Sequence, residues 1–211
     1  MKKVTYSVIT ILALFVASCA SSKKQVIVPL NSSVELDDTY TIIWNGISKA
    51  YRYDNGQWLR AESYDYQFDV VQKRYENHWK SVKSLHRIHP DYDGKAGDRD
   101  QTMYFDLVYK NLTDRKVQAV INSSLGNGTG TTDTEFRKSV LTMNVPNASN
   151  FMPYNKFRIT QNYNYEKGEL TETVELFKEK DGKEIPFMKN EEIALIFIKG
   201  KLDIAPTTFK Q

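Results

Sequence analysis

Apolar and polar residues alternate along much of the chain after residue 39, which predicts β-strands there. Tyr64, Tyr66, Phe68 and Val70 alternate with polar residues, the period of a half-buried strand. Residues 39–47 are rich in β-branched and aromatic side chains, which favour strands. The turn sequence Asp54-Asn55-Gly56 between aromatic residues predicts a hairpin over 50–61.

The second half of the chain continues this pattern, with strands expected at intervals of about ten residues. The expected strands are 103–109, 117–121, 135–145, 156–165, 169–178 and 192–198, with turns at Lys167-Gly168 and Asp181-Gly182. The run 193–198 is apolar on both faces and predicts a central buried strand. The glycine-rich segment 122–132 is expected to be a flexible loop.

One segment departs from the strand period and predicts a helix. Apolar residues in it are spaced by three and four positions, namely Val71, Tyr75, Trp79, Val82 and Leu85 or His86. This spacing is typical of an amphipathic helix, here expected over 71–86 and ending before Pro90.

Together these elements predict an antiparallel β-sandwich with one helix. Residues 100–205 are expected to form the sandwich, and residues 39–99 either belong to it or form a small β/α annex. The run from Phe105 to Val117 resembles the strand, Asn-rich turn and strand of bacterial immunoglobulin-like or fibronectin-like modules. That resemblance implies an immunoglobulin-like sandwich.

The first 20 residues read as an export signal. Lys2 and Lys3 precede an apolar run, 8–16, which is shorter than the roughly 20 residues of a membrane span. The run ends at Val16-Ala17-Ser18-Cys19, which resembles the signal of bacterial lipoproteins, and Cys19 is the only cysteine in the chain. Cleavage of an ordinary secretory signal after Ala20 is the alternative.

The resemblance implies that residues 1–18 are removed and that Cys19 carries a diacylglyceryl thioether and an acylated amine, with fatty chains such as palmitate. Several acyl chains exceed the two signals needed for stable anchoring in a lipid bilayer. Residues 19–38 then form a lipidated tether. Because Ala20 and not Asp follows the cysteine, the resemblance favours the outer membrane, on its periplasmic or its surface face.

Charge and composition narrow the possible partners. The formal net charge is +3, of which the signal's two lysines contribute +2, so the mature chain is near neutral. Near neutrality argues against nucleic acid as a partner. Without a second cysteine there is no disulfide, so burial of the core must supply the stability.

Two groups of residues are candidate metal ligands. Asp91, Asp93, Asp98 and Asp100 lie close together among glycines and can supply oxygens to calcium, although the EF-hand spacing is not met. His86 and His89 lie three residues apart at the end of the expected helix, a spacing that suits zinc. The alternative is a solvated loop whose aspartates cap turns, next to exposed histidines.

The remaining candidate is an aromatic set, in which Trp44, Tyr51, Tyr53 and Trp58 form a binding face for glycans or proteins or, alternatively, part of a core. No catalytic triad or phosphate-binding loop is recognisable. The sequence therefore favours a non-enzymatic lipoprotein that acts as an accessory or interaction subunit beside an envelope protein. A metal- or glycan-binding lipoprotein is the alternative.

The anchor is tested by substituting Cys19→Ser. Removing the thiol should abolish labelling by a fatty-acid analogue and release the protein from the membrane fraction, while the control Ser22→Ala should keep both properties. A Cys19→Ser protein that is still labelled would end the lipoprotein interpretation.

Overall fold

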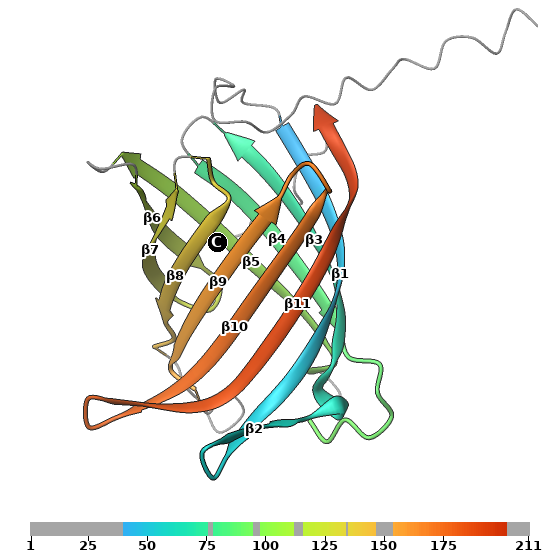
Figure 1. The fold of residues 1–211 in the computed structure, drawn as a ribbon, viewed down its shortest axis with the longest axis vertical. Coiled ribbons are helices and arrows are strands. Elements are labelled where there is room, and N and C mark those ends of the chain that lie inside the picture. Colours follow the sequence, from blue (N-terminus) through green and yellow to red (C-terminus); the bar gives the residue numbers. More distant parts are fainter. Residues whose placement is uncertain are drawn as a thin grey trace, which may run out of the picture.

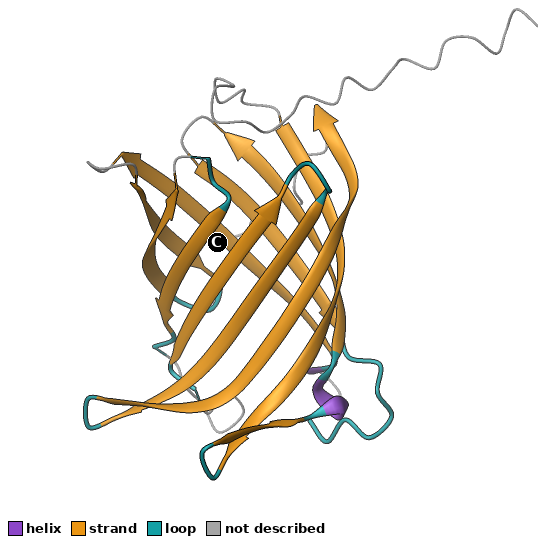
Figure 2. Ribbon diagram, viewed as in Figure 1, coloured by secondary structure: helices purple, strands orange, loops and turns teal. Residues whose placement is uncertain are grey.

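Consecutive antiparallel strands form one 11-stranded sheet in the computed structural model, which describes residues 40–75, 78–94, 98–111, 116–133, 135–146 and 154–201 (Figure 1). The strands are β1 (Tyr40–Asp54), β2 (Gln57–Arg60), β3 (Tyr66–Tyr75), β4 (His78–His86), β5 (Asp100–Asn111), β6 (Lys116–Ser123), β7 (Asn127–Asp133), β8 (Lys138–Asn144), β9 (Lys156–Asn164), β10 (Glu169–Lys180) and β11 (Lys183–Lys201). Among the described residues the only helical turn is η1 (Glu62–Tyr64) (Figure 2).

The sheet closes on itself because its last strand pairs with its first. β11 lies antiparallel to β1 from Tyr40↔Lys201 to Arg52↔Met188, so ten strands form a closed barrel. β2 pairs only with the end of β1 and forms a hairpin that projects from the lower end of the barrel in Figure 1. The β10–β11 turn lies at this lower end, and the β9–β10 turn lies at the opposite, upper end.

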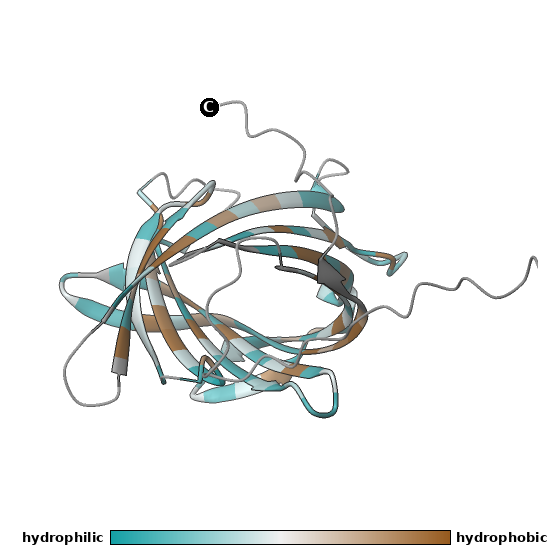
Figure 3. Cartoon of the chain, turned by 90° about the horizontal axis from the view of Figure 1, so that it is seen from above, coloured by the Kyte–Doolittle hydropathy of each residue, from teal (hydrophilic) through white to brown (hydrophobic). Residues whose placement is uncertain are grey.

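The residue alternation that makes the strands also gives the barrel two different faces. Along β8, Leu141 is 4% exposed and points into the lumen, whereas Val140 beside it is 47% exposed on the outer surface. Viewed along the barrel, the strands form a ring along which apolar and polar residues alternate (Figure 3). Buried inward residues form two apolar clusters, one around Trp44 and Phe68 and one around Ile121 and Met143.

The predicted turns are confirmed. Asn55 and Gly56 have φ of 47° and 85°, the left-handed conformations that a tight two-residue hairpin requires. Asp181 and Gly182 repeat this arrangement, with φ of 55° and 72°, between β10 and β11. Most strands predicted after residue 102 are also present, with bounds that differ by a few residues.

The predicted β-sandwich is wrong, because the structure has one closed sheet and not two packed sheets. A sandwich and a barrel both consist of short antiparallel strands. Here each strand from β3 to β11 pairs with the next along the chain, and the β1–β11 pairing closes the sheet. Strands on both sides of the expected boundary at residue 99 belong to this sheet, where β4 pairs with β5.

The predicted helix over 71–86 is also wrong, because this segment forms β3 and β4. Gln72, Ser81 and Lys83 point into the lumen, while Val71 and Val82 occupy alternate positions on the outer face. A strand is recognised when apolar residues recur at every second position. Here polar residues take some inward positions and apolar residues take some outward ones, so that alternation is not visible in the sequence. The apolar positions that remain happen to recur every three or four residues.

Two further expectations fail for local reasons. The glycine-rich loop is strand β7, in which a Cβ on Gly128 would lie 2.0 Å from the carbonyl oxygen of Thr142, so glycine permits the close approach of β8. Residues 193–198 lie on the closing strand and are not buried on both faces, because Leu195 and Phe197 are 58% and 70% exposed.

The signal, Cys19 and the tether lie outside the described residues. Within the part of the chain that the structure describes, no helical segment has the length and apolar character needed to cross a bilayer.

Substituting Trp44→Ala tests the packing inside the barrel. Trp44 is fully buried, its indole Nε1 donates to Gln72 Oε1 at 2.8 Å, and its ring packs on Tyr163. The substitution should lower the free energy of unfolding by about 3–5 kcal/mol in a urea titration. Ile47→Ala, at an outward position 51% exposed on the same strand, should change it by no more than about 0.5 kcal/mol. Equal effects would contradict the inward and outward assignment.

Candidate functional site

The barrel lumen contains a cavity of about 780 Å³, the candidate site of this protein. It extends from Arg87 and Tyr92 at the lower end to Phe136 and Tyr165 at the upper end. Inward side chains such as Phe105 and Leu107 line it and are only half-buried. An eight-stranded barrel is just wide enough for its own side chains or one small ligand, so a ten-stranded barrel has more room.

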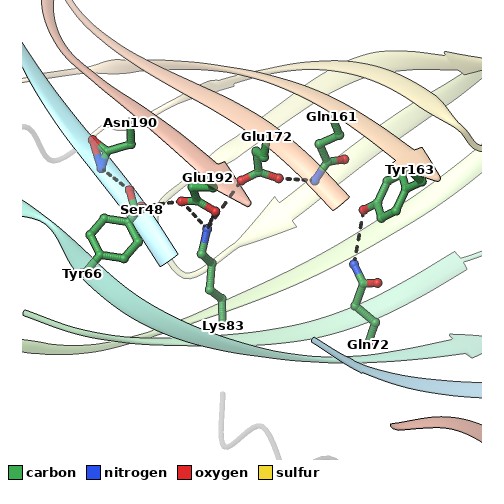
Figure 4. Close-up of polar contacts among 9 residues, drawn as sticks. All are labelled: Ser48, Tyr66, Gln72, Lys83, Gln161, Tyr163, Glu172, Asn190 and Glu192. Atoms are coloured by element: carbon green, nitrogen blue, oxygen red, sulfur yellow. Dashed lines mark hydrogen bonds and ion pairs between the residues drawn. The ribbon is translucent and has the colours of Figure 1, made fainter. Parts of the chain in front are cut away.

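Three charged side chains meet in this lumen (Figure 4). Lys83 projects from β4, and its Nζ lies 2.5 Å from Glu192 Oε2 on β11 and 3.5 Å from Glu172 Oε1 on β10. Glu172 and Glu192 are direct partners in the β10–β11 register, so their side chains lie next to each other. All three are largely buried: the side chain of Lys83 is 10% exposed, that of Glu172 9% and that of Glu192 2%.

Polar neighbours hold the two carboxylates. The Tyr66 hydroxyl donates to Glu192, and Gln161 Nε2 donates to Glu172 Oε2 at 2.5 Å. Asn190, two residues before Glu192 on the same face of β11, donates to Ser48 Oγ at 3.4 Å. We call Ser48, Tyr66, Lys83, Gln161, Glu172, Asn190 and Glu192 the lumen cluster. It joins six strands of the barrel across the cavity.

Burial and mutual charge determine the protonation of this cluster. Burial, together with the charge of Glu172, raises the pKa of Glu192 despite its contact with Lys83. Burial alone would lower the pKa of Lys83, but the carboxylates, Glu192 foremost, more than offset this and raise it. Burial and the Glu192 charge also raise the pKa of Tyr66. Lys83 is therefore a cation, and Tyr66 a neutral donor, at neutral pH.

Arginine and tyrosine side chains gather at the lower end of the lumen. The Arg87 guanidinium lies 5.6 Å from the centre of the Tyr66 ring and 5.3 Å from that of Tyr92. Arg99 also lies over Tyr92, whose ring meets Tyr64 edge-on. Burial raises the pKa of Tyr154, another residue lining the cavity, to about 12. The lower end is thus lined by arginines and neutral phenols, with Asp98 next to them.

The predicted metal ligands take separate positions outside the lumen cluster. His86 Nδ1 pairs with Asp100 at the ends of β4 and β5, on the outer face. Asp93 Oδ1 accepts from the Tyr64 hydroxyl at 2.5 Å, and His89 Nδ1 accepts from the backbone N–H of Asp91 at 3.2 Å. The backbone oxygen of Asp98 accepts a hydrogen bond from the Arg87 guanidinium. In the described ranges no three such side chains converge on a point that suits a metal ion.

The predicted aromatic set divides between two places. Trp44 lies inside the barrel wall, whereas Tyr53 and Trp58 pack edge-on across the β1–β2 hairpin with ring centres 5.1 Å apart. Lys189 on β11 lies over Tyr51 and Trp58. The hairpin aromatics therefore form a group of their own without Trp44.

Sequence reasoning missed the lumen cluster. Its one detectable signal is a charged residue within an apolar row of period two, as in β10, where Glu172 follows Leu170 and precedes Val174 and Leu176. In β4 the signal is weaker, because Lys83 follows the polar Ser81 and precedes the apolar Leu85 on the inward face. Such a residue faces the apolar side of its strand, so it must find partners there.

Substituting Lys83→Met tests the electrostatics of the cluster. Folding raises the pKa of the Lys83 ammonium. The ammonium therefore stabilises the fold fully at any pH below the pKa of an unfolded lysine, and this stabilisation is lost only as the pH rises through the higher pKa of the folded state. At neutral pH the variant should lose about 3–5 kcal/mol, since two buried carboxylates lose their cation. The loss should shrink at mildly acidic pH, because the raised pKa of Glu192 lets this carboxyl become neutral at a higher pH than an ordinary one.

Urea unfolding at both pH values measures this effect. Lys80→Met, at an alternate position on the same strand, is the control and should cost about 1 kcal/mol or less at either pH. A loss for Lys83→Met that does not depend on pH would show that packing, and not charge, holds the cluster.

A comparison with known proteins gives no relative: no protein-family model matches the chain, and no curated protein matches it. The geometry and charge of the lumen are the features that support a function.

Proposed function

We propose that this protein binds one small, mainly apolar ligand in its barrel lumen and holds it at the bacterial outer membrane through lipidated Cys19. The observation that carries the proposal is the cavity of about 780 Å³, which falls in the size range of small-molecule sites. Its lining also resembles that of small-molecule sites, because it has many apolar and aromatic side chains and a few convergent polar groups.

The exposure of the lining favours binding over a packed core. Protein interiors are normally close-packed, and inward apolar side chains are then covered. Here Met103, Phe105 and Leu107 along β5 point inward but stay half-buried, beside fully buried Ile121 on β6. A ligand that covers these side chains gains free energy from the apolar area it removes from water.

The chemistry of the lumen favours binding over catalysis. Lys83 is held by Glu192, and its pKa is raised, so it stays protonated and is a poor nucleophile or base at neutral pH. His86 and His89 lie outside the lumen. The accessory role expected from the sequence then becomes concrete, because an anchored barrel can hold or present a small ligand beside an envelope partner.

Filling the lumen tests the proposal. Leu141→Trp adds an indole to the cavity lining and should weaken binding of the neutral apolar fluorophore N-phenyl-naphthylamine by at least about tenfold. Val140→Trp places the same side chain on the outer face of β8 and should leave binding unchanged. Fluorescence titration measures both, with thermal melting as a check on folding. Unchanged binding by a folded Leu141→Trp protein would contradict a lumen site.

A further inference from the structure

The lumen cluster contains more hydrogen-bond acceptors than donors. A carboxylate has about four acceptor positions, so Glu172 and Glu192 together offer about eight. The donors that reach them are the three N–H groups of Lys83, the hydroxyl of Tyr66 and the amide of Gln161. A polar group that enters the cluster therefore finds acceptors to bind, and so must be a donor.

Asn190 adds an acceptor with no partner among the described residues. Its side-chain oxygen Oδ1 is buried without a hydrogen bond, while its Nδ2 donates to Ser48. The residue is 7% exposed, lines the cavity, and lies two positions before Glu192 on the same face of β11. A buried acceptor without a donor costs about 1–3 kcal/mol, which a ligand donor recovers.

The charges of the cluster are unequal as well. Two carboxylates face one ammonium, which leaves one negative charge in excess when both are ionised. Glu192 is engaged by Lys83 and Tyr66, whereas Glu172 is 3.5 Å from Lys83 and is held mainly by neutral Gln161. An uncompensated charge in a low-dielectric interior is unfavourable, and a second cation next to Glu172 removes it.

We infer that the lumen ligand is amphipathic and carries a protonated amine, which binds Glu172 while the apolar part lies along the half-buried aromatic and aliphatic lining. A second donor on the ligand can then bind the free oxygen of Asn190. This inference rests on the proposed function and specifies its ligand. Lys83 then has a positioning role, because it fixes Glu192 and leaves Glu172 as the carboxylate for the ligand.

A series of ligands with one chain and three head groups tests this. Dodecylamine, dodecanol and dodecanoate, all below their micelle concentrations and at neutral pH, compete with N-phenyl-naphthylamine for the barrel. Dodecylamine should bind at least about tenfold more tightly than dodecanol, and dodecanoate more weakly than both, because its charge repels the cluster. If none of the three displaces the probe, the proposed function itself fails.

The same series on variants locates the amine. Glu172→Gln keeps the shape of the side chain and should reduce the preference for amine over alcohol to about threefold or less, while dodecanol still binds. Glu175→Gln removes an equal charge from the alternate, outward face of β10, where Glu175 faces Arg158, and should keep the full preference. Should Glu172→Gln not fold, Glu172→Asp keeps the charge but draws it back by one methylene and should weaken dodecylamine severalfold.

Three results would overturn the inference while leaving lumen binding intact. These are equal affinities for amine and alcohol, an amine preference that survives both lumen substitutions, and tightest binding of dodecanoate. The last would place the head group at the lower-end arginines, Arg52 and Arg87, instead of the cluster.

Discussion

The pairing of β11 with β1 is the constraint on which the rest of the structure depends. It joins the two ends of a meander, so the ten barrel strands have neighbours on both sides and no open edge between first and last. Closure also separates the side chains into an outer and an inner set. Each inner side chain must then meet others across the lumen, because no second sheet covers that face. The cavity and the cluster both follow from this geometry.

The lumen cluster is a costly arrangement by the measure of stability alone. Taking charges out of water is unfavourable, and a buried ion pair often stabilises a fold no more than apolar side chains of similar size. Lys83 nevertheless spans from β4 to Glu172 and Glu192 on the opposite wall, and neutral donors hold both carboxylates. Ligand recognition supplies a reason for these groups that packing does not.

The sequence predicted local structure well where the turn chemistry was strong. Asn55-Gly56 and Asp181-Gly182 adopt positive φ between paired strands, as their residue types require. The strands β5, β6, β9 and β10 followed from alternation. Closure itself could not be predicted, because the outer residues Ile193, Leu195 and Phe197 give the closing strand the apolar pattern of a buried one.

The candidate site was hidden for a related physical reason. Sequence reasoning sought charged residues in loops, whereas Lys83, Glu172 and Glu192 lie within strands that are distant along the chain. Their proximity arises from the β10–β11 register and from the reach of Lys83 across the lumen, and neither is visible in a local pattern. The polar residues of β3 and β4 that contribute to the lumen also produced the mistaken helix.

Methyl NMR during titration with dodecanol tests most directly whether the lumen is the binding site. Leu141 and Met143 lie among the lumen-lining residues, whereas Val140 and Ile193 are exposed on the outer face. A lumen site predicts saturable shifts of the Leu141 and Met143 methyl signals, with those of Val140 and Ile193 nearly unchanged. Shifts confined to the outer methyl groups, or none at saturating ligand, would contradict it.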